Sequence, residues 1–160
     1  MSTRKAEITR NLQEVKERIR SAANSVNRDP AEIQLIVVTK TFPISDIEIL
    51  RELGESNFGE NRDQEAGPKA EMISATWHFQ GQIQSNKIKS ICQWADVVHS
   101  ISSEKEILKF AQSERKHQLF LQVSLDGQVG RGGANPADLA QLADLVNESN
   151  NLELLGLMAV

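Results

Sequence analysis

The stretch LIVVTK, residues 35–40, places four apolar residues directly before Thr39 and Lys40. An unbroken run of Leu, Ile and Val is typical of a strand that is buried on both faces, because helices then cover both sides of the sheet. The pattern predicts a core strand over 35–40. Lys40 therefore stands at the C-terminal end of that strand.

Similar short apolar segments recur along the rest of the chain. They are separated by about 20 residues, a spacing that leaves room for one helix between consecutive strands. The five further strands are expected at 57–61, 76–81, 96–101, 119–125 and 152–160.

Helix signals occur before and between these strands. A stripe of apolar residues at helical spacing predicts one helix before the first strand, and it consists of Ile8, Leu12, Val15, Ile19 and Val26. Two capping boxes and one Asn-Pro pair indicate further helix starts, namely Ser45 with Glu48, Ser103 with Glu106, and Asn135 with Pro136. Gly54 marks the end of the helix that Ser45 begins.

The alternation of strands and helices fits two architectures, an open doubly wound sheet and a (β/α) TIM-type barrel. The usual nucleotide fingerprints of open sheets, GxGxxG after the first strand and GxxxxGK[ST], are missing from the sequence, which favours the barrel. Because eight strands close such a barrel, we expect residues 1–160 to form one incomplete domain of about six strands. The chain is then a fragment that is truncated in its sixth strand, and its open edge predicts aggregation or dimerisation through that strand.

Composition and charge argue against several classes of protein. The net charge is −4 at pH 7, the sequence pI is near 5.4, and no basic block is present, which argues against nucleic acid as a partner. The sequence has no signal-peptide pattern and no apolar run of the roughly 18 residues that a membrane span needs, which predicts a cytoplasmic protein. Cys92 is the single cysteine, in agreement with a reducing compartment.

Lys40 is the first candidate functional residue. In barrels of this type the chemistry collects at the C-terminal ends of the strands, and a lysine amine placed there can form a Schiff base with a carbonyl compound. A lysine at a strand end can equally extend its head group into solvent. The position of Lys40 alone leaves both interpretations open.

Polar residues close the other predicted strands as well, among them Asn61, His78, His99 and Gln122. Each has an ordinary structural role available, such as a helix cap for Asn61 or a hydrogen-bonded core residue for His78. Since the C-terminal ends of parallel strands lie at one edge of a sheet, these residues together predict one polar mouth around Lys40.

Six blocks of the sequence resemble, in order and spacing, the pyridoxal phosphate homeostasis proteins, also called the YggS/PROSC family. These blocks are VVTKTFP, FGENRDQE, WHFQGQIQSNK, VVHSI, LQVSLDG and GLMAV. The resemblance covers essentially the whole chain. It implies a single-domain barrel like the N-terminal domain of alanine racemase, with pyridoxal 5'-phosphate (PLP) as the cofactor.

The resemblance also implies roles for individual residues. Lys40 would hold PLP as an internal aldimine, Asn61 would face the cofactor from the second strand, and Met158 would form part of the pocket wall. His78 and Asn86 match the block WHF…NK, for which a structural role beside the pocket and a direct contact are both open.

Two departures from the family pattern concern the cofactor. Many members have a second lysine two places after the Schiff-base lysine, where this chain has Phe42, and a transimination relay through that position is therefore in doubt. The C-terminal serine-rich and VRIG-type blocks that form the family's phosphate cup are absent. The glycine-rich stretch 126–135, with Arg131 as its cation, is an alternative phosphate site, and a mobile surface loop is its other interpretation.

The resemblance implies a PLP carrier that serves intracellular PLP homeostasis without efficient catalysis, with no catalytic residue and no metal ligand. PLP-dependent apo-enzymes are the implied recipients, and the intact protein is expected to be a monomer or a weak dimer without membrane contact.

A PLP-dependent amino-acid racemase is the alternative. Racemisation needs acid and base groups on both faces of the substrate, alanine racemases use a tyrosine for one of them, and this sequence contains no tyrosine. His78 or His99 keeps the racemase interpretation open. A third possibility is a cofactor-free Schiff-base aldolase that acts through Lys40.

Overall fold

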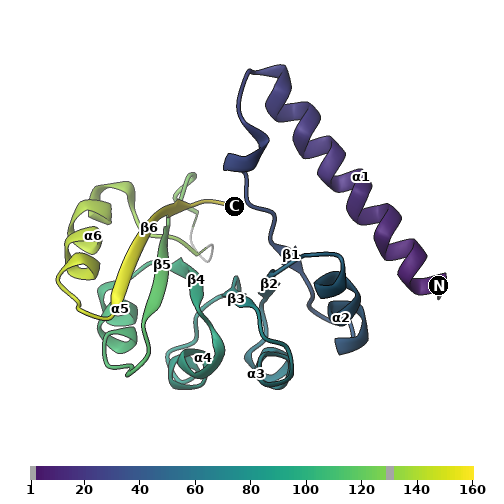
Figure 1. Cartoon of the computed structure of the whole chain (residues 1–160). Coiled ribbons are helices and arrows are strands. Elements are labelled where there is room, and N and C mark those ends of the chain that lie inside the picture. The colour runs from purple at the N-terminus through teal and green to yellow at the C-terminus, as the bar shows by residue number, and fades with distance from the viewer. Residues whose placement is uncertain (1–2, 129–131) are drawn as a thin grey trace.

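The computed structural model describes residues 3–128 and 132–160, and in them it shows a six-stranded sheet whose neighbouring strands are all parallel. The strands follow one another across the sheet in chain order (Figure 1). Their bounds are β1 Val37–Val38, β2 Asn57–Glu60, β3 Thr76–Phe79, β4 Val97–Ile101, β5 His117–Gln122 and β6 Leu152–Met158. A strand lies at each of the six predicted places, within narrower limits except for β5, which begins two residues before the predicted start and ends three residues before the predicted end.

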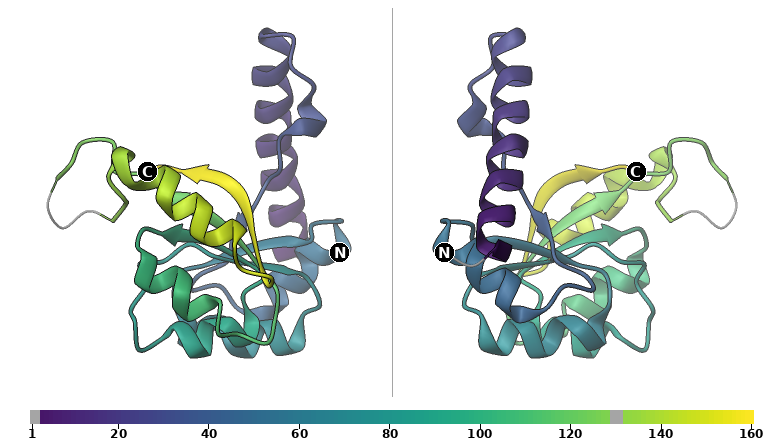
Figure 2. Two further views of the ribbon diagram at one scale, coloured as in Figure 1. Left: turned by 90° about the vertical axis from the view of Figure 1, so that its left-hand side faces the viewer. Right: turned by 90° about the vertical axis from the view of Figure 1, so that its right-hand side faces the viewer.

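Helices connect the strands and lie along the outer side of the curved sheet (Figure 1). Those from α2 to α6 form a row there, whereas α1 stands apart from the row in the side views (Figure 2). Their bounds are α1 Thr3–Ser25, α2 Ile44–Glu52, α3 Asp63–Met72, α4 Ile88–Trp94, α5 Glu104–Phe110 and α6 Leu139–Asn147, with 3₁₀ turns η1 Pro30–Glu32 and η2 Pro136–Asp138.

This repeating unit of a parallel strand followed by an outer helix is that of a (β/α) barrel, so the predicted incomplete TIM-type barrel is confirmed. Across 3–128 and 132–160, none of the helices combines the length and the hydropathy that crossing a membrane requires.

The hydrophobic core lies between the sheet and the row of helices. Phe58 of β2 and Trp77 of β3 are buried with ring centroids 5.6 Å apart, and Phe79 meets Trp94 of α4 edge to face at 6.0 Å. Aromatic pairs in such tilted geometries contribute stability beyond the apolar area that they bury. Because side chains alternate along a strand, the neighbouring residues of β2 and β3 point to the other face of the sheet.

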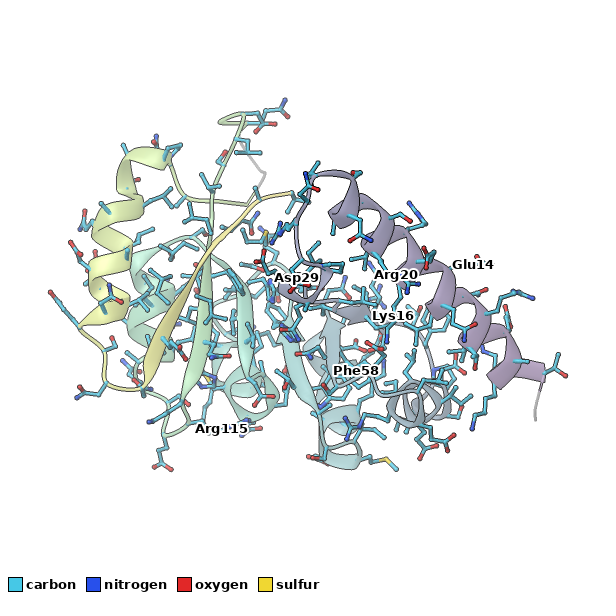
Figure 3. All side chains as sticks on the ribbon, turned by 45° about the horizontal axis from the view of Figure 1, so that its top comes forward. Glu14, Lys16, Arg20, Asp29, Phe58 and Arg115 are labelled. Carbon is cyan, nitrogen blue, oxygen red and sulfur yellow. The ribbon has the colours of Figure 1, made fainter. Side chains whose placement is uncertain are left out.

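The long helix α1 packs against α2 and the core mainly through its N-terminal half. Ile8 and Leu12 pack against the core, whereas Val26 lies beyond the end of the helix and is 70% exposed. The predicted apolar stripe is therefore wrong for Val26. Lys16, on the side of α1 that faces the sheet in Figure 3, forms an ion pair with Glu55, which is buried just before β2.

Two expectations for the first strand and helix are wrong. The strand expected over 35–40 shrinks to two residues, and Val38 is 47% exposed, because β1 is an edge strand whose one partner within 3–128 and 132–160 is β2. The second helix begins directly after Pro43, so Ser45 lies inside the first turn and makes no capping bond. Gly54 does end this segment, with a φ of 93° that glycine adopts without strain.

The other two predicted helix starts are confirmed. Ser103 and Glu106 form the expected reciprocal capping box at the start of α5. Asn135 Oδ1 accepts a hydrogen bond of 3.0 Å from Ala137 N at the start of η2, which leads directly into α6.

Only the strand spacing and the helix-cap role open to Asn61 indicated a helix in the place of α3, whose own sequence carries a turn signal. Its sequence contains Gly67 and Pro68, which together are a turn signal, and Pro68 lies inside the helix. Tertiary contacts outweigh this signal, because Ala66 is fully buried and Trp94 Nε1 donates a hydrogen bond of 2.9 Å to Asp63 Oδ1.

Candidate functional site

The carboxyl ends of all six strands lie at one edge of the sheet, because every neighbouring pair is parallel. Lys40 follows the end of β1 by two residues, Asn61 directly follows β2, and Met158 is the last residue of β6. The paired residues of β1 and β2 end at Val38 and Gly59, so Lys40 and Asn61 each lie two residues beyond this last pair. Since β1 and β6 are the two outer strands of the sheet, Met158 and Lys40 come from opposite sides of it.

Lys40 lies exposed in a tight turn, in which Phe42 N donates a hydrogen bond of 3.1 Å to Thr39 O. Among residues 3–128 and 132–160, none forms a hydrogen bond or ion pair with the Lys40 amine. A primary amine is thus presented, without a competing partner in the described chain, at the edge where barrel proteins of this type carry out their chemistry.

Thr39, the residue before Lys40, is buried and makes three hydrogen bonds besides the one that its carbonyl accepts from Phe42 N. Its backbone N–H donates to Gly59 O at 2.9 Å, its hydroxyl donates to Glu60 Oε1 at 2.7 Å, and its carbonyl accepts from Lys69 Nζ at 2.8 Å. Lys69 Nζ also lies 2.6 Å from Glu60 Oε1, and both of these charged side chains are buried. The network ties the end of β1 to β2 and to α3.

Thr41, the residue after Lys40, has a φ of 67°, which is unusual for a β-branched residue and costs of order 1–3 kcal/mol. Its backbone N–H donates a hydrogen bond of 3.0 Å to Glu65 Oε2. This hydrogen bond, followed by the one from Arg62, lowers the pKa of Glu65, so the acceptor is a carboxylate at neutral pH. The hydrogen bond to Glu65 of α3 therefore stabilises the strained conformation of Thr41.

Asn61 is exposed, and its backbone lies against the end of β3. A Cβ atom added to Gly81 would stand 2.4 Å from Asn61 O, so the approach requires glycine. At Gly59 an added Cβ would stand 2.5 Å from Gln80 Oε1, which is the end of a flexible side chain that can move aside. Gly81 is therefore the glycine that allows the ends of β2 and β3 to lie close together.

His78 is buried in β3 and belongs to a polar chain across β2, β3 and β4. Its Nδ1 lies 2.9 Å from His99 Nε2, its Nε2 lies 3.0 Å from Asn57 Oδ1, and the ring of His99 stacks on Phe120 with centroids 4.7 Å apart. Because the Asn57 carbonyl oxygen can only accept, His78 donates from Nε2 and accepts at Nδ1 from His99.

Burial keeps this pair of imidazoles neutral. Desolvation, with the charge of His99 as a second cause, lowers the pKa of His78 to about 4, and desolvation also lowers the pKa of His99. His78 is thus a neutral, hydrogen-bonded residue of the sheet at neutral pH.

Met158 is half-buried, and its carbonyl accepts a hydrogen bond of 2.8 Å from Val123 N. It lies opposite Gln122 in the register of β5 and β6. Asn86 is exposed in the turn before α4. Arg131, the cation of the alternative phosphate site, lies outside the described residues.

Three of the residues that hold the turn of Lys40 were not identified from the sequence. Glu65 and Lys69 are four apart and would share one face of a helix, but this signal requires α3, which the Gly-Pro pair obscured. The third is Thr39. Glu60, near the end of the second predicted strand, was expected with the polar residues of the mouth, but its side chain is fully buried and bonded to Thr39 and Lys69.

Comparisons of the sequence and the fold with known proteins show the class of protein to which this chain belongs. The family model described as "Alanine racemase, N-terminal domain" matches residues 8–160. The crystal structure of alanine racemase from E. faecalis superposes with a TM-score of 0.67 at 16% identity, covers 92% of this chain and 41% of that chain, and so shows the fold alone. The protein is of the class built on the alanine racemase N-terminal barrel.

A nearer relative from Mycobacterium leprae, named "Pyridoxal phosphate homeostasis protein", is 36% identical over 98% of this chain and 71% of its own length. The chain belongs to the pyridoxal phosphate homeostasis protein family, as its sequence blocks predicted. A solved structure of PipY from Synechococcus elongatus PCC7942, with PLP bound, has a TM-score of 0.73 and 32% identity. That match covers 89% of this chain and 69% of PipY.

Proposed function

We propose that this protein binds PLP covalently at Lys40 and serves intracellular PLP homeostasis as a carrier without efficient catalysis. The observation that carries the proposal is the exposed Lys40 amine, which has no partner in the described chain and stands in a turn fixed on both sides. The names of the relatives and the PLP bound to PipY support the choice of cofactor.

The residues at this edge fit an aldehyde cofactor. Lys40 would hold the aldehyde through Nζ, with a C=N bond in place of the C=O bond and the oxygen lost as water. Hydrolysis reverses the reaction, and an incoming primary amine can displace Lys40 Nζ in the same way. When bound, PLP supplies an electron sink that stabilises carbanions, and a carrier leaves this capacity unused.

The proposal gives the neighbouring residues binding roles. Asn61, directly after β2, would face the cofactor from the strand next to β1, and Met158 would form part of the pocket wall from β6. His78 would contribute to the floor through its hydrogen bonds to Asn57 and His99.

Two features support a carrier over an amino-acid racemase. The sequence contains no tyrosine, which alanine racemases use as the group opposite the lysine. The two histidines that could replace it, His78 and His99, are buried, and a hydrogen bond of 2.9 Å joins His78 Nδ1 and His99 Nε2. We further propose a cytoplasmic location and transfer of PLP to apo-enzymes, since the relatives are named for PLP homeostasis.

A PLP titration tests the covalent site. The wild-type protein should develop the visible absorbance of a Schiff base, and Lys40→Arg should not, because a guanidinium does not form the C=N bond. Lys87→Arg is the matched control, since Lys87 precedes α4 near the same ends of the strands. Equal spectra for wild type and Lys40→Arg would refute Lys40 as the site.

Amino-acid turnover separates the carrier from the racemase. PLP-loaded protein should convert L-alanine to D-alanine no faster than free PLP does at the same concentration. Enzymatic turnover that Lys40→Arg abolishes would show a racemase and contradict the carrier.

A further inference from the structure

We propose that α3 is the element that positions Lys40, with Lys69 and Glu65 as the positioning residues. The inference rests on the proposed function, because it concerns the amine that would take PLP. Neither residue needs to touch the cofactor, since each acts on the backbone next to Lys40.

Lys69 holds the side of the turn that precedes Lys40. Its Nζ donates to Thr39 O at 2.8 Å, and the same oxygen accepts from Phe42 N at 3.1 Å, so the ammonium group fixes the carbonyl that closes the turn. Glu60 Oε1 accepts both from Lys69 Nζ, at 2.6 Å, and from the Thr39 hydroxyl, at 2.7 Å. Lys69, Glu60 and Thr39 thus form one buried hydrogen-bond network.

Glu65 holds the side that follows Lys40. Its carboxylate accepts from Thr41 N at 3.0 Å, at the residue whose φ of 67° is strained. Glu65 and Lys69 are four residues apart, and residues at this spacing share one face of a helix. Side chains on one face of α3 therefore bind the backbone of Thr39 and of Thr41, while the Lys40 side chain forms no hydrogen bond with α3.

The burial of Lys69 and Glu60 points to such a role and is poorly explained by stability. A buried ion pair loses its hydration, and replacing one with uncharged residues of similar size is often neutral or stabilising. The pair is not even optimally satisfied, because Glu60 Oε2 is buried without a hydrogen-bond partner in the described part of the chain. What the pair provides is a fixed position for Thr39 O.

Two sets of variants test the inference. Glu65→Ala removes the acceptor of Thr41 N, and its matched control Glu71→Ala removes an exposed carboxylate from the same helix. Because Lys69→Met alone would strand a buried carboxylate, the second test is the double variant Glu60→Gln with Lys69→Met. Its control is Lys109→Met, which removes a lysine that donates to a distant backbone carbonyl, Ser85 O.

Two readouts are needed. The first is amide hydrogen exchange over residues 39–42 in PLP-free protein, which should be about tenfold faster in both test variants, since each loses a charge-assisted hydrogen bond at the turn. The second is the rate at which Lys40 captures PLP into a borohydride-reducible product, which should fall about tenfold. Lys69→Arg, which keeps a cationic donor, should restore part of both values.

Unchanged exchange and unchanged capture in folded test variants would overturn the inference, as would equal effects in the control variants. If the wild-type protein captured no PLP, the proposed function would fail, whereas exchange over 39–42 would still decide whether α3 holds the turn. Thermal unfolding of each variant establishes that it is folded.

Discussion

At the scale of the residue, the backbone of Thr41 sets the direction in which the chain leaves Lys40. We predict that Thr41→Gly raises the free energy of unfolding by up to about 1 kcal/mol, because relief of a left-handed conformation worth roughly 1–2 kcal/mol exceeds the backbone entropy cost of glycine, roughly 0.5–1 kcal/mol. The same change should slow PLP capture, since the turn loses its rigidity. Urea unfolding measures the first effect, and a loss of stability would contradict it.

The buried histidines predict a dependence of stability on pH. The pKa of His78 in the folded protein, about 4, lies below its usual value of 6.5, so the unfolded chain binds more protons between these limits. The free energy of unfolding should therefore fall as the pH falls from about 6.5 to 4 and should show no contribution from His78 above that window.

Urea unfolding at a series of pH values checks this sign. His78→Gln should flatten the decline, because a glutamine side chain does not titrate, and the opposite slope in the wild type would exclude a buried neutral His78. The lowered pKa of His117, caused first by desolvation, adds to the same trend in both proteins.

At the scale of the element, the close approach of β3 to β2 depends on Gly81. We predict that Gly81→Ala lowers the free energy of unfolding by about 1–3 kcal/mol. The added Cβ would overlap Asn61 O, which is a backbone atom and cannot move aside as the end of a flexible side chain can. PLP capture at Lys40 should also slow as Asn61 is displaced.

Gly67→Ala is the control for this substitution. Gly67 lies inside α3, where an added Cβ meets only an ordinary contact with Trp94 at 4.0 Å, so alanine should stabilise the helix by about 0.5–1 kcal/mol. Equal stability changes for the two glycines would refute the steric argument.

The elements also show what the sequence could and could not predict. Strand β4 was predictable because Val97, Val98 and Ile101 have high strand propensity, although the buried His99 and Ser100 interrupt the apolar pattern. The capping box at Ser103 was predictable because both partners are local. Helix α3 was not, since its Gly-Pro pair is a local turn signal that distant contacts such as Trp94 to Asp63 outweigh.

In the candidate site too, local sequence signals were predictable and long-range contacts were not. Lys40 was recognisable from its place after a strand and from the family blocks around it. The residues that hold its turn were not, because the hydrogen bond from Lys69 to Thr39 spans 30 positions and no local pattern encodes it.

At the scale of the whole molecule, β6 is an outer strand that pairs only with β5 among the described residues. Leu155 and Leu157 on this strand are 42% and 58% exposed, and an open apolar strand of this kind favours pairing with a second copy. We predict concentration-dependent self-association of the 160-residue chain, measured by sedimentation velocity.

The association should be weakened by Leu157→Lys, because a charge on an outer strand opposes pairing. Leu108→Lys is the control, since Leu108 is similarly exposed, at 49%, on α5. A monomer at every concentration, or equal effects of the two lysines, would contradict pairing through β6.

The most direct measurement is to identify the residue that carries PLP. The protein is incubated with PLP, reduced with borohydride and digested, and the modified peptide is mapped by mass spectrometry. We predict one phosphopyridoxyl group on Lys40 and none on Lys89 or Lys105, which are also exposed. Modification spread over surface lysines, or located at a single residue other than Lys40, would contradict a PLP site at the end of β1.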